Sequence, residues 1–113
     1  MQVFFLVLNR TECLQPLLQK MLANDVHGAT LLESTGMMNV LGQSAEDGPM
    51  FGTLRQLFDP TRKSSKTLMI VLEDAQVSTV RALVNEVTGG LDKPDTGIMF
   101  SIPVLFAEGM VGC

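Results

Sequence analysis

Residues 67–90, TLMIVLEDAQVSTVRALVNEVTGG, contain the signals of a strand, a helix start and a helix end in one continuous stretch. The first seven residues, 67–73, are rich in branched aliphatic side chains and predict a strand. Asp74 follows it and is a residue type that caps helices. Gly89 stands where a left-handed helix end is expected. The predicted helix has one apolar face, formed by Val77, Val80, Leu83, Val84 and Val87.

The sequence before and after residues 67–90 predicts three further strands and one further helix. Short apolar runs indicate strands at 2–9, 28–35 and 98–106, and Pro103 places the last of them at a sheet edge or a bulge. An apolar stripe from Leu14 to about Asn24 predicts a helix, with Pro16 in its first turn. The order β-α-β-β-α-β is the ferredoxin-like arrangement. We therefore expect a single α+β domain over 1–113, with a four-stranded antiparallel sheet and two helices on one face.

The connection between the second and third strands, about 37–66, is unusually long. A connection of this length without regular structure is commonly functional or disordered. It contains several glycines and an apolar island, MFGTLRQLF. We therefore interpret it as an insertion that is either functional or disordered.

The predicted strands are apolar on both faces. The runs VFFLVL (3–8) and LMIVL (68–72) lack the alternation expected of a sheet with one solvated face. Two short helices can cover only one face, so the other face needs a second cover. The sheets of identical subunits are the simplest cover, and the alternative is a monomer whose long connection folds back over the sheet.

Composition excludes several classes of function. The formal charge of -4 disfavours broad nucleic-acid binding. No apolar run approaches the roughly 20 residues of a membrane span, and no signal peptide is recognisable at the start. The two cysteines make no disulfide framework, which favours a cytoplasmic protein. The single histidine, His27, predicts no metal site.

Three segments together resemble the nitrogen-regulatory PII signalling superfamily: VHGATLLESTG (26–36), the stretch 67–90, and GIMFSIPV (97–104). The resemblance implies a homotrimer whose sheets line the threefold axis, and a protein that is not an enzyme. It also implies that 37–66 is the T-loop, which docks onto a target protein. An adenine nucleotide such as ATP, ADP or AMP would bind between subunits.

Carried over by position, the resemblance divides the expected ligand site between two segments. Gly36 and Met37 would lie at the base of the T-loop beside the base and ribose, with Met38 next to them. Gly89, Gly90 and Gly97 would present backbone to the phosphates. Ile98 stands where the family has a lysine, and Lys93, within the longer 89–97 loop, would take that lysine's place.

The end of the chain leaves a second hypothesis open. The segment LFAEGMVGC has no basic residue, although the family has arginines after the fourth strand. The chain also has no tyrosine, which excludes the family's tyrosine modification. The alternative is therefore a structural or partner-binding trimer that has lost nucleotide binding.

Overall fold

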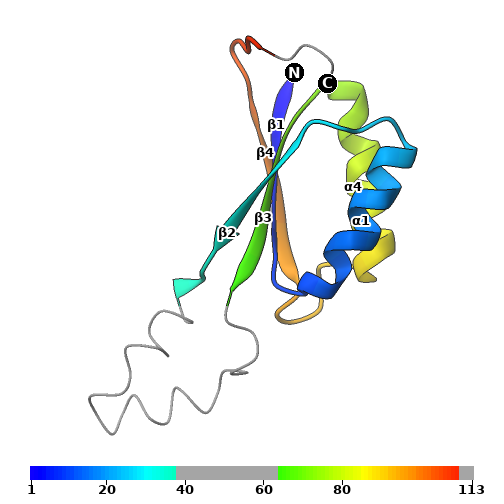
Figure 1. Ribbon diagram of the computed structural model, residues 1–113, viewed down its shortest axis with the longest axis vertical. Helices are drawn as coiled ribbons and strands as arrows, with labels where there is room; N and C mark the ends of the chain where they lie inside the picture. The colour runs from blue at the N-terminus through cyan, green and yellow to red at the C-terminus, as the bar shows by residue number, and fades with distance from the viewer. Residues whose placement is uncertain (38–63, 110–113) are drawn as a thin grey trace, which may run out of the picture.

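The computed structural model describes residues 1–37 and 64–109 (Figure 1). Along the chain it has strand β1 (Gln2–Leu8), the short 3-10 helix η1 (Thr11–Cys13), helix α1 (Leu14–Ala23) and strand β2 (Ala29–Ser34). Strand β3 (Ser65–Leu72), helix α4 (Asp74–Thr88) and strand β4 (Gly97–Pro103) complete the order. The predicted connection at 37–66 therefore falls mostly outside the described residues.

The four strands form one antiparallel sheet in the order β2-β3-β1-β4. Leu6 in the central strand β1 lies opposite Leu68 of β3 and Met99 of β4. Both α-helices lie on the same side of this sheet (Figure 1). The predicted four-stranded antiparallel sheet with two helices is confirmed, and it is compatible with the ferredoxin-like arrangement.

The N-cap of helix α4 lies one residue earlier in the chain than the sequence predicted. We expected Asp74 to be the cap, but Glu73 is the N-cap residue, and its N–H donates to the Gln76 side chain at 3.0 Å. Asp74 is instead the first helical residue, and its carboxylate accepts hydrogen bonds from the Met1 ammonium and the Gln2 side chain. The predicted left-handed end at Gly89 is confirmed, with φ of 78°.

The last strand is shorter than the sequence predicted. We expected it to run to residue 106, but it ends at Pro103. Pro103 is paired with Gln2, the first residue of β1, and beyond this pair the Val104 N–H donates to the Met1 carbonyl at 3.2 Å. Nothing else in β1 is left to extend the ladder. Pro103 does lie in an edge strand, as predicted.

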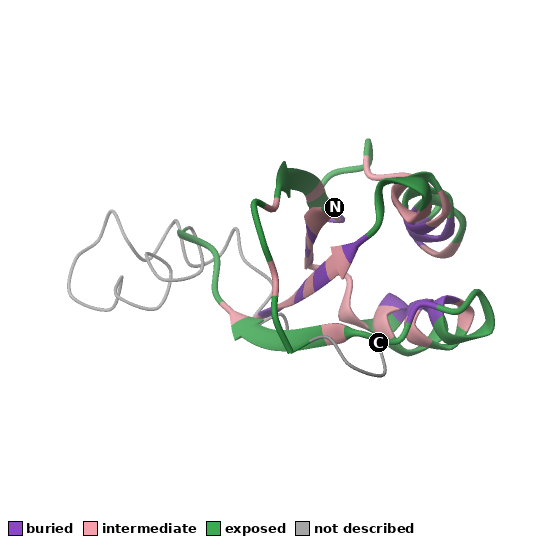
Figure 2. Ribbon diagram, turned by 90° about the horizontal axis from the view of Figure 1, so that it is seen from above, coloured by how far each residue is buried: buried purple, intermediate pink, exposed green. Residues whose placement is uncertain are grey.

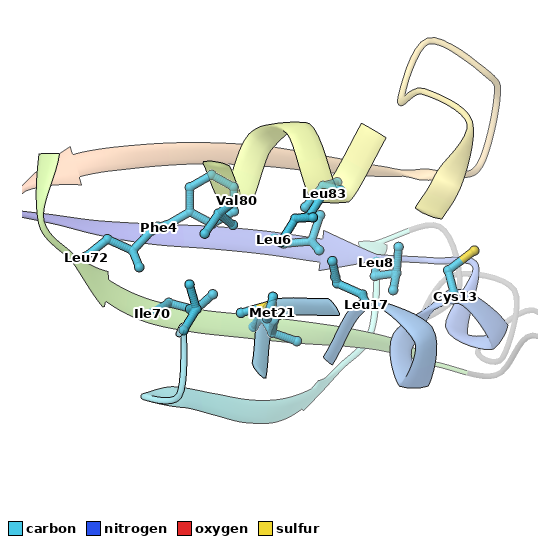
Figure 3. Packing of buried hydrophobic residues seen from close by; sticks show 13 residues of the cluster. Phe4, Leu6, Leu8, Cys13, Leu17, Met21, Ile70, Leu72, Val80 and Leu83 are labelled. Atoms are coloured by element: carbon cyan, nitrogen blue, oxygen red, sulfur yellow. The ribbon is translucent and has the colours of Figure 1, made fainter. Parts of the chain in front are cut away.

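The hydrophobic core lies between the sheet and the two helices (Figure 3). Alternate residues of the two central strands point toward the helices, as the two-residue period of a strand requires. Helices α1 and α4 lie over these side chains and contribute buried residues of their own (Figure 2). The fully buried residues of the cluster include Phe4, Leu6, Leu8, Leu17, Met21, Leu68, Ile70, Leu72, Val80 and Val84.

The face of the sheet that points away from the helices is also apolar; we call it the open face. The strand register places its side chains in three cross-strand rows. On β4, Ile98, Phe100 and Ile102 are 59%, 47% and 48% exposed. Phe100 stacks on Phe5, with ring centroids 5.1 Å apart. The rows are Leu32-Thr67-Val7-Ile98, Thr30-Met69-Phe5-Phe100 and Val71-Val3-Ile102.

Candidate ligand-binding site

Both segments of the predicted ligand site lie at one end of the sheet, which we call the loop end. Strands β1 and β2 finish there, and strands β3 and β4 begin there. The register shows this directly, because Ser34 pairs with Ser65 and Leu8 pairs with Gly97. The loop end therefore carries both the 89–97 loop and the base of the 37–66 connection.

The 89–97 loop begins with a change of backbone direction at the end of α4. Gly89 and Gly90 have φ of 78° and 109°, conformations that L side chains rarely adopt. The Gly90 N–H donates to the Thr88 hydroxyl at 3.2 Å, and that hydroxyl donates to the Val84 carbonyl at 2.7 Å. Thr88 is buried. The double glycine is therefore held in place by the last turn of the helix.

Two charged side chains of the same loop fold back over this double glycine. A Cβ atom built on Gly89 lies 3.3 Å from the Lys93 ammonium nitrogen. A Cβ atom built on Gly90 lies only 2.8 Å from a carboxylate oxygen of Asp92. The surface that two glycines leave free of side chains is thus shared by one cation and one anion.

Gly97 has a structural role that the sequence prediction did not assign to it. A Cβ atom at this position lies 2.5 Å from the Val7 carbonyl oxygen, closer than real Cβ atoms approach. The residue before it, Thr96, is buried, and its carbonyl accepts the N–H of Asn9 at 3.0 Å. Gly97 is therefore required for the start of β4 to pair with the end of β1.

Arg10 also belongs to the loop end, and the sequence prediction missed it. It lies just after β1, and its Nη1 donates to the Thr88 carbonyl at 3.2 Å while Nε contacts the Glu12 carboxylate at 3.3 Å. A basic residue just after a strand was the available signal. It could be interpreted only once the pairing of β1 with β4 was known, since that pairing brings Arg10 to the end of α4.

Gly36 and Met37 lie on the other side of the loop end, just after β2. Among the described residues, no atom other than those of its chain neighbours lies within 4 Å of a Cβ built on Gly36, and Met37 is 73% exposed. Met38, the third residue predicted there, lies outside the described residues. Strands β2 and β4 are the two edges of the sheet. Three strand spacings separate them, about 14 Å, so one subunit does not bring the two segments together.

A cluster of hydroxyl groups marks the base of the 37–66 connection. The Ser34 hydroxyl is 2.8 Å from that of Ser65 and 2.7 Å from that of Thr67. On the opposite face of the sheet, Glu33 forms an ion pair with Lys66. These contacts fasten the end of β2 to the start of β3, so the long connection leaves from a rigid base.

The described residues narrow the chemistry that the loop end offers. Within residues 1–37 and 64–109, no three His, Cys, Asp or Glu side chains gather as metal ligands. No helix in the same ranges is long and apolar enough to cross a membrane. Among these residues, the groups at the loop end are glycine backbone, hydroxyls, carboxylates and three cations (Arg10, Lys66 and Lys93), which are suited to holding a polar ligand.

Comparison with known proteins supports the fold alone. No protein-family model matches the chain, and no curated protein matches it. Among solved structures, a functionally unknown protein from Pediococcus pentosaceus ATCC 25745 is similar, with a TM-score of 0.62 and 14% sequence identity. The match covers 96% of this chain and 95% of that one. The chain therefore shares its α+β architecture, over nearly its whole length, with a protein whose own function is unknown.

Proposed function

We propose that this protein is a non-enzymatic, PII-like regulatory protein of the cytoplasm. In this proposal it is a homotrimer with the ferredoxin-like fold, and it binds an adenine nucleotide between subunits. Ligand binding changes the 37–66 connection, which docks onto a target protein. The observation that carries the proposal is the open face, because each of the four strands contributes apolar side chains to it.

The open face favours assembly over a monomer. Soluble monomers rarely expose a contiguous apolar patch of more than a few hundred Å². Here the three cross-strand rows form one continuous surface from Leu32 on one edge to Ile98 on the other. Burying this surface against the same surface of identical subunits removes it from water, which is the main driving force for association.

The separation of the two ligand segments also favours a site between subunits. Gly36 and Met37 lie after one edge strand, whereas Gly89, Gly90 and Lys93 precede the other. In a cyclic assembly, two different surfaces of neighbouring subunits meet at each interface. An edge carrying Gly36 can then face the neighbouring edge carrying the 89–97 loop, and the complete site forms once per interface.

One observation favours the alternative function, a structural or partner-binding trimer without a nucleotide. Within residues 1–37 and 64–109 the loop end offers few free positive groups. The Arg10 guanidinium is engaged by the Thr88 carbonyl and by Glu12, and Lys66 is paired with Glu33. Phosphate binding needs several donors or positive groups to offset the ligand's charge. A trimer that uses only its 37–66 connection would not need them.

A combined measurement of mass and ligand response tests the proposal. Light scattering at micromolar concentration should give three times the chain mass of 12.3 kDa. Thermal unfolding with ATP, ADP and AMP should show a saturable rise in Tm for at least one of them. A trimer with no response to any nucleotide supports the alternative. A monomer at this concentration overturns both forms of the proposal.

A further inference from the structure

We propose that Asp92 determines which adenine ligand the loop end accepts, favouring a ligand with little phosphate charge over a triphosphate. This inference rests on the proposed function, since it assigns the ligand class of the same site. It makes Asp92 a specificity-determining residue and names adenosine or its monophosphate as the ligand class.

The position of the Asp92 carboxylate is the first observation. One of its oxygens lies 2.8 Å from the point where Gly90 would carry a Cβ atom. That point is on the side of the double glycine that has no side chain of its own, which is where a ligand can approach the backbone closely. A phosphate placed there meets a carboxylate of the same charge sign.

The direction of helix α4 is the second observation. Phosphate groups commonly bind at helix N-termini, where free N–H groups and the helix dipole favour negative charge. The 89–97 loop continues from the C-terminal end of α4, where the Thr88 carbonyl accepts a hydrogen bond from the Arg10 guanidinium. The helix therefore adds negative potential to the same region as Asp92.

The three cations that the described residues place at the loop end do not reverse this balance. Lys66 is already paired with Glu33. The Arg10 guanidinium is shared between the Thr88 carbonyl and the Glu12 carboxylate. The Lys93 ammonium lies against Gly89 at the carbonyl end of the helix, where it offsets the helix dipole. Lys93 stands next to Asp92 in the chain and lies at a helix C-terminus, so this one lysine suits a ligand with one phosphate or none.

A carboxylate at this position also has a positive role. Acidic side chains in nucleotide sites commonly accept hydrogen bonds from ribose hydroxyls. Asp92 can accept a ribose hydroxyl while the glycine backbone stays close to the sugar. The same group that repels a triphosphate then holds a nucleoside.

Calorimetry of wild-type protein and Asp92→Asn with adenosine, AMP and ATP tests the inference. Wild-type protein should bind AMP or adenosine more tightly than ATP. Asp92→Asn should bind ATP roughly three- to fivefold more tightly than wild type, the factor expected for one partly exposed charge contact. The gain should shrink between low and high salt, because screening weakens exposed charge interactions.

Asp25→Asn is the matched control, because it makes the same change of charge beyond the C-terminal end of α1. Asp25 has φ of 62°, which asparagine also tolerates. It should leave the affinity for all three ligands unchanged. An equal gain in ATP binding in this control overturns the inference, since net charge alone would explain it.

The remaining outcomes separate this inference from the proposed function. If wild-type protein binds ATP more tightly than AMP and adenosine, or if Asp92→Asn binds ATP no better than wild type does, only the assignment of Asp92 is wrong. If neither protein binds any of the three ligands at millimolar concentration, the nucleotide site itself is wrong, and the inference falls with it.

Discussion

At the scale of single residues, the glycines predicted to face a ligand have different roles. Gly89 and Gly90 shape the exposed turn after α4, and Gly36, after β2, has no close neighbour for a Cβ atom among the described residues. Gly97 is packed against the β1 backbone. The sequence pattern could place all four near the loop end but could not separate them, because the contact that decides the role of Gly97 is with Val7, far away in the chain.

Gly97→Ala should destabilise the protein, whereas Gly36→Ala should not. The new methyl group at 97 would lie 2.5 Å from the Val7 carbonyl oxygen, so the β1–β4 pairing must shift. We expect a loss of roughly 1–3 kcal/mol in the free energy of unfolding for Gly97→Ala, and a change within about 0.5 kcal/mol for Gly36→Ala. Urea denaturation measures both, and equal stabilities would contradict the role assigned to Gly97.

Asp74 should make stability depend on acid pH. The Asp74 carboxylate accepts hydrogen bonds from the Met1 ammonium and from the Gln2 side chain. These bonds, that from Met1 most of all, hold the pKa of the Asp74 carboxyl group below its ordinary value of 3.8. A carboxyl group with a lowered pKa in the folded state stabilises the protein above its unfolded pKa. This contribution is lost as pH falls through the lower folded pKa. Asp74→Asn should therefore be less stable than wild type at neutral pH, and the difference should disappear in acid.

Acetylation of the Met1 amino group provides the control for Asp74. It removes the ammonium that is the largest cause of the lowered pKa. The titration of the Asp74 carboxyl, followed by NMR, should then move up toward its ordinary range. A titration that stays where it was would show that the ammonium is not the cause.

At the scale of elements, the sequence predicted the local features well and the long-range ones poorly. The apolar stripe of α4 and the aliphatic runs of β1 and β3 identify elements because each depends on neighbours along the chain. The end of β4 was misplaced because it depends on where β1 begins. Arg10 was missed for the same reason, since only strand pairing brings it to Thr88.

The central strand should be the most sensitive element to loss of side-chain volume. Leu6 is fully buried between the sheet and the helices, whereas Leu22 on α1 is 63% exposed. Leu6→Ala should cost about 2–5 kcal/mol in the free energy of unfolding, the usual range for a buried leucine. Leu22→Ala should cost less than about 0.5 kcal/mol. Chemical denaturation that gave similar losses for the two variants would contradict the location of the core.

At the scale of the whole molecule, the sheet has two apolar faces to shield from water, and both helices lie on the same face. The helices cover one face, and the described part of the chain places nothing over the three cross-strand rows of the other. Apolar runs in the sequence already indicated this imbalance. Which surface would be left uncovered could not be predicted, because it depends on the side of the sheet to which α1 and α4 return.

Ile98→Lys should dissociate the assembly without unfolding the subunit. Ile98 is 59% exposed on edge strand β4, so a lysine there fits a single subunit but places a charge inside an apolar interface. Light scattering should show a shift toward the mass of one chain, while circular dichroism stays unchanged. Leu22→Lys, with a similar exposed fraction on the helical side, should keep the assembly intact. If both variants assemble like wild type, the open face is not the interface. The proposed site between subunits, formed by Gly36 and Met37 of one subunit and the 89–97 loop of the next, then loses its support.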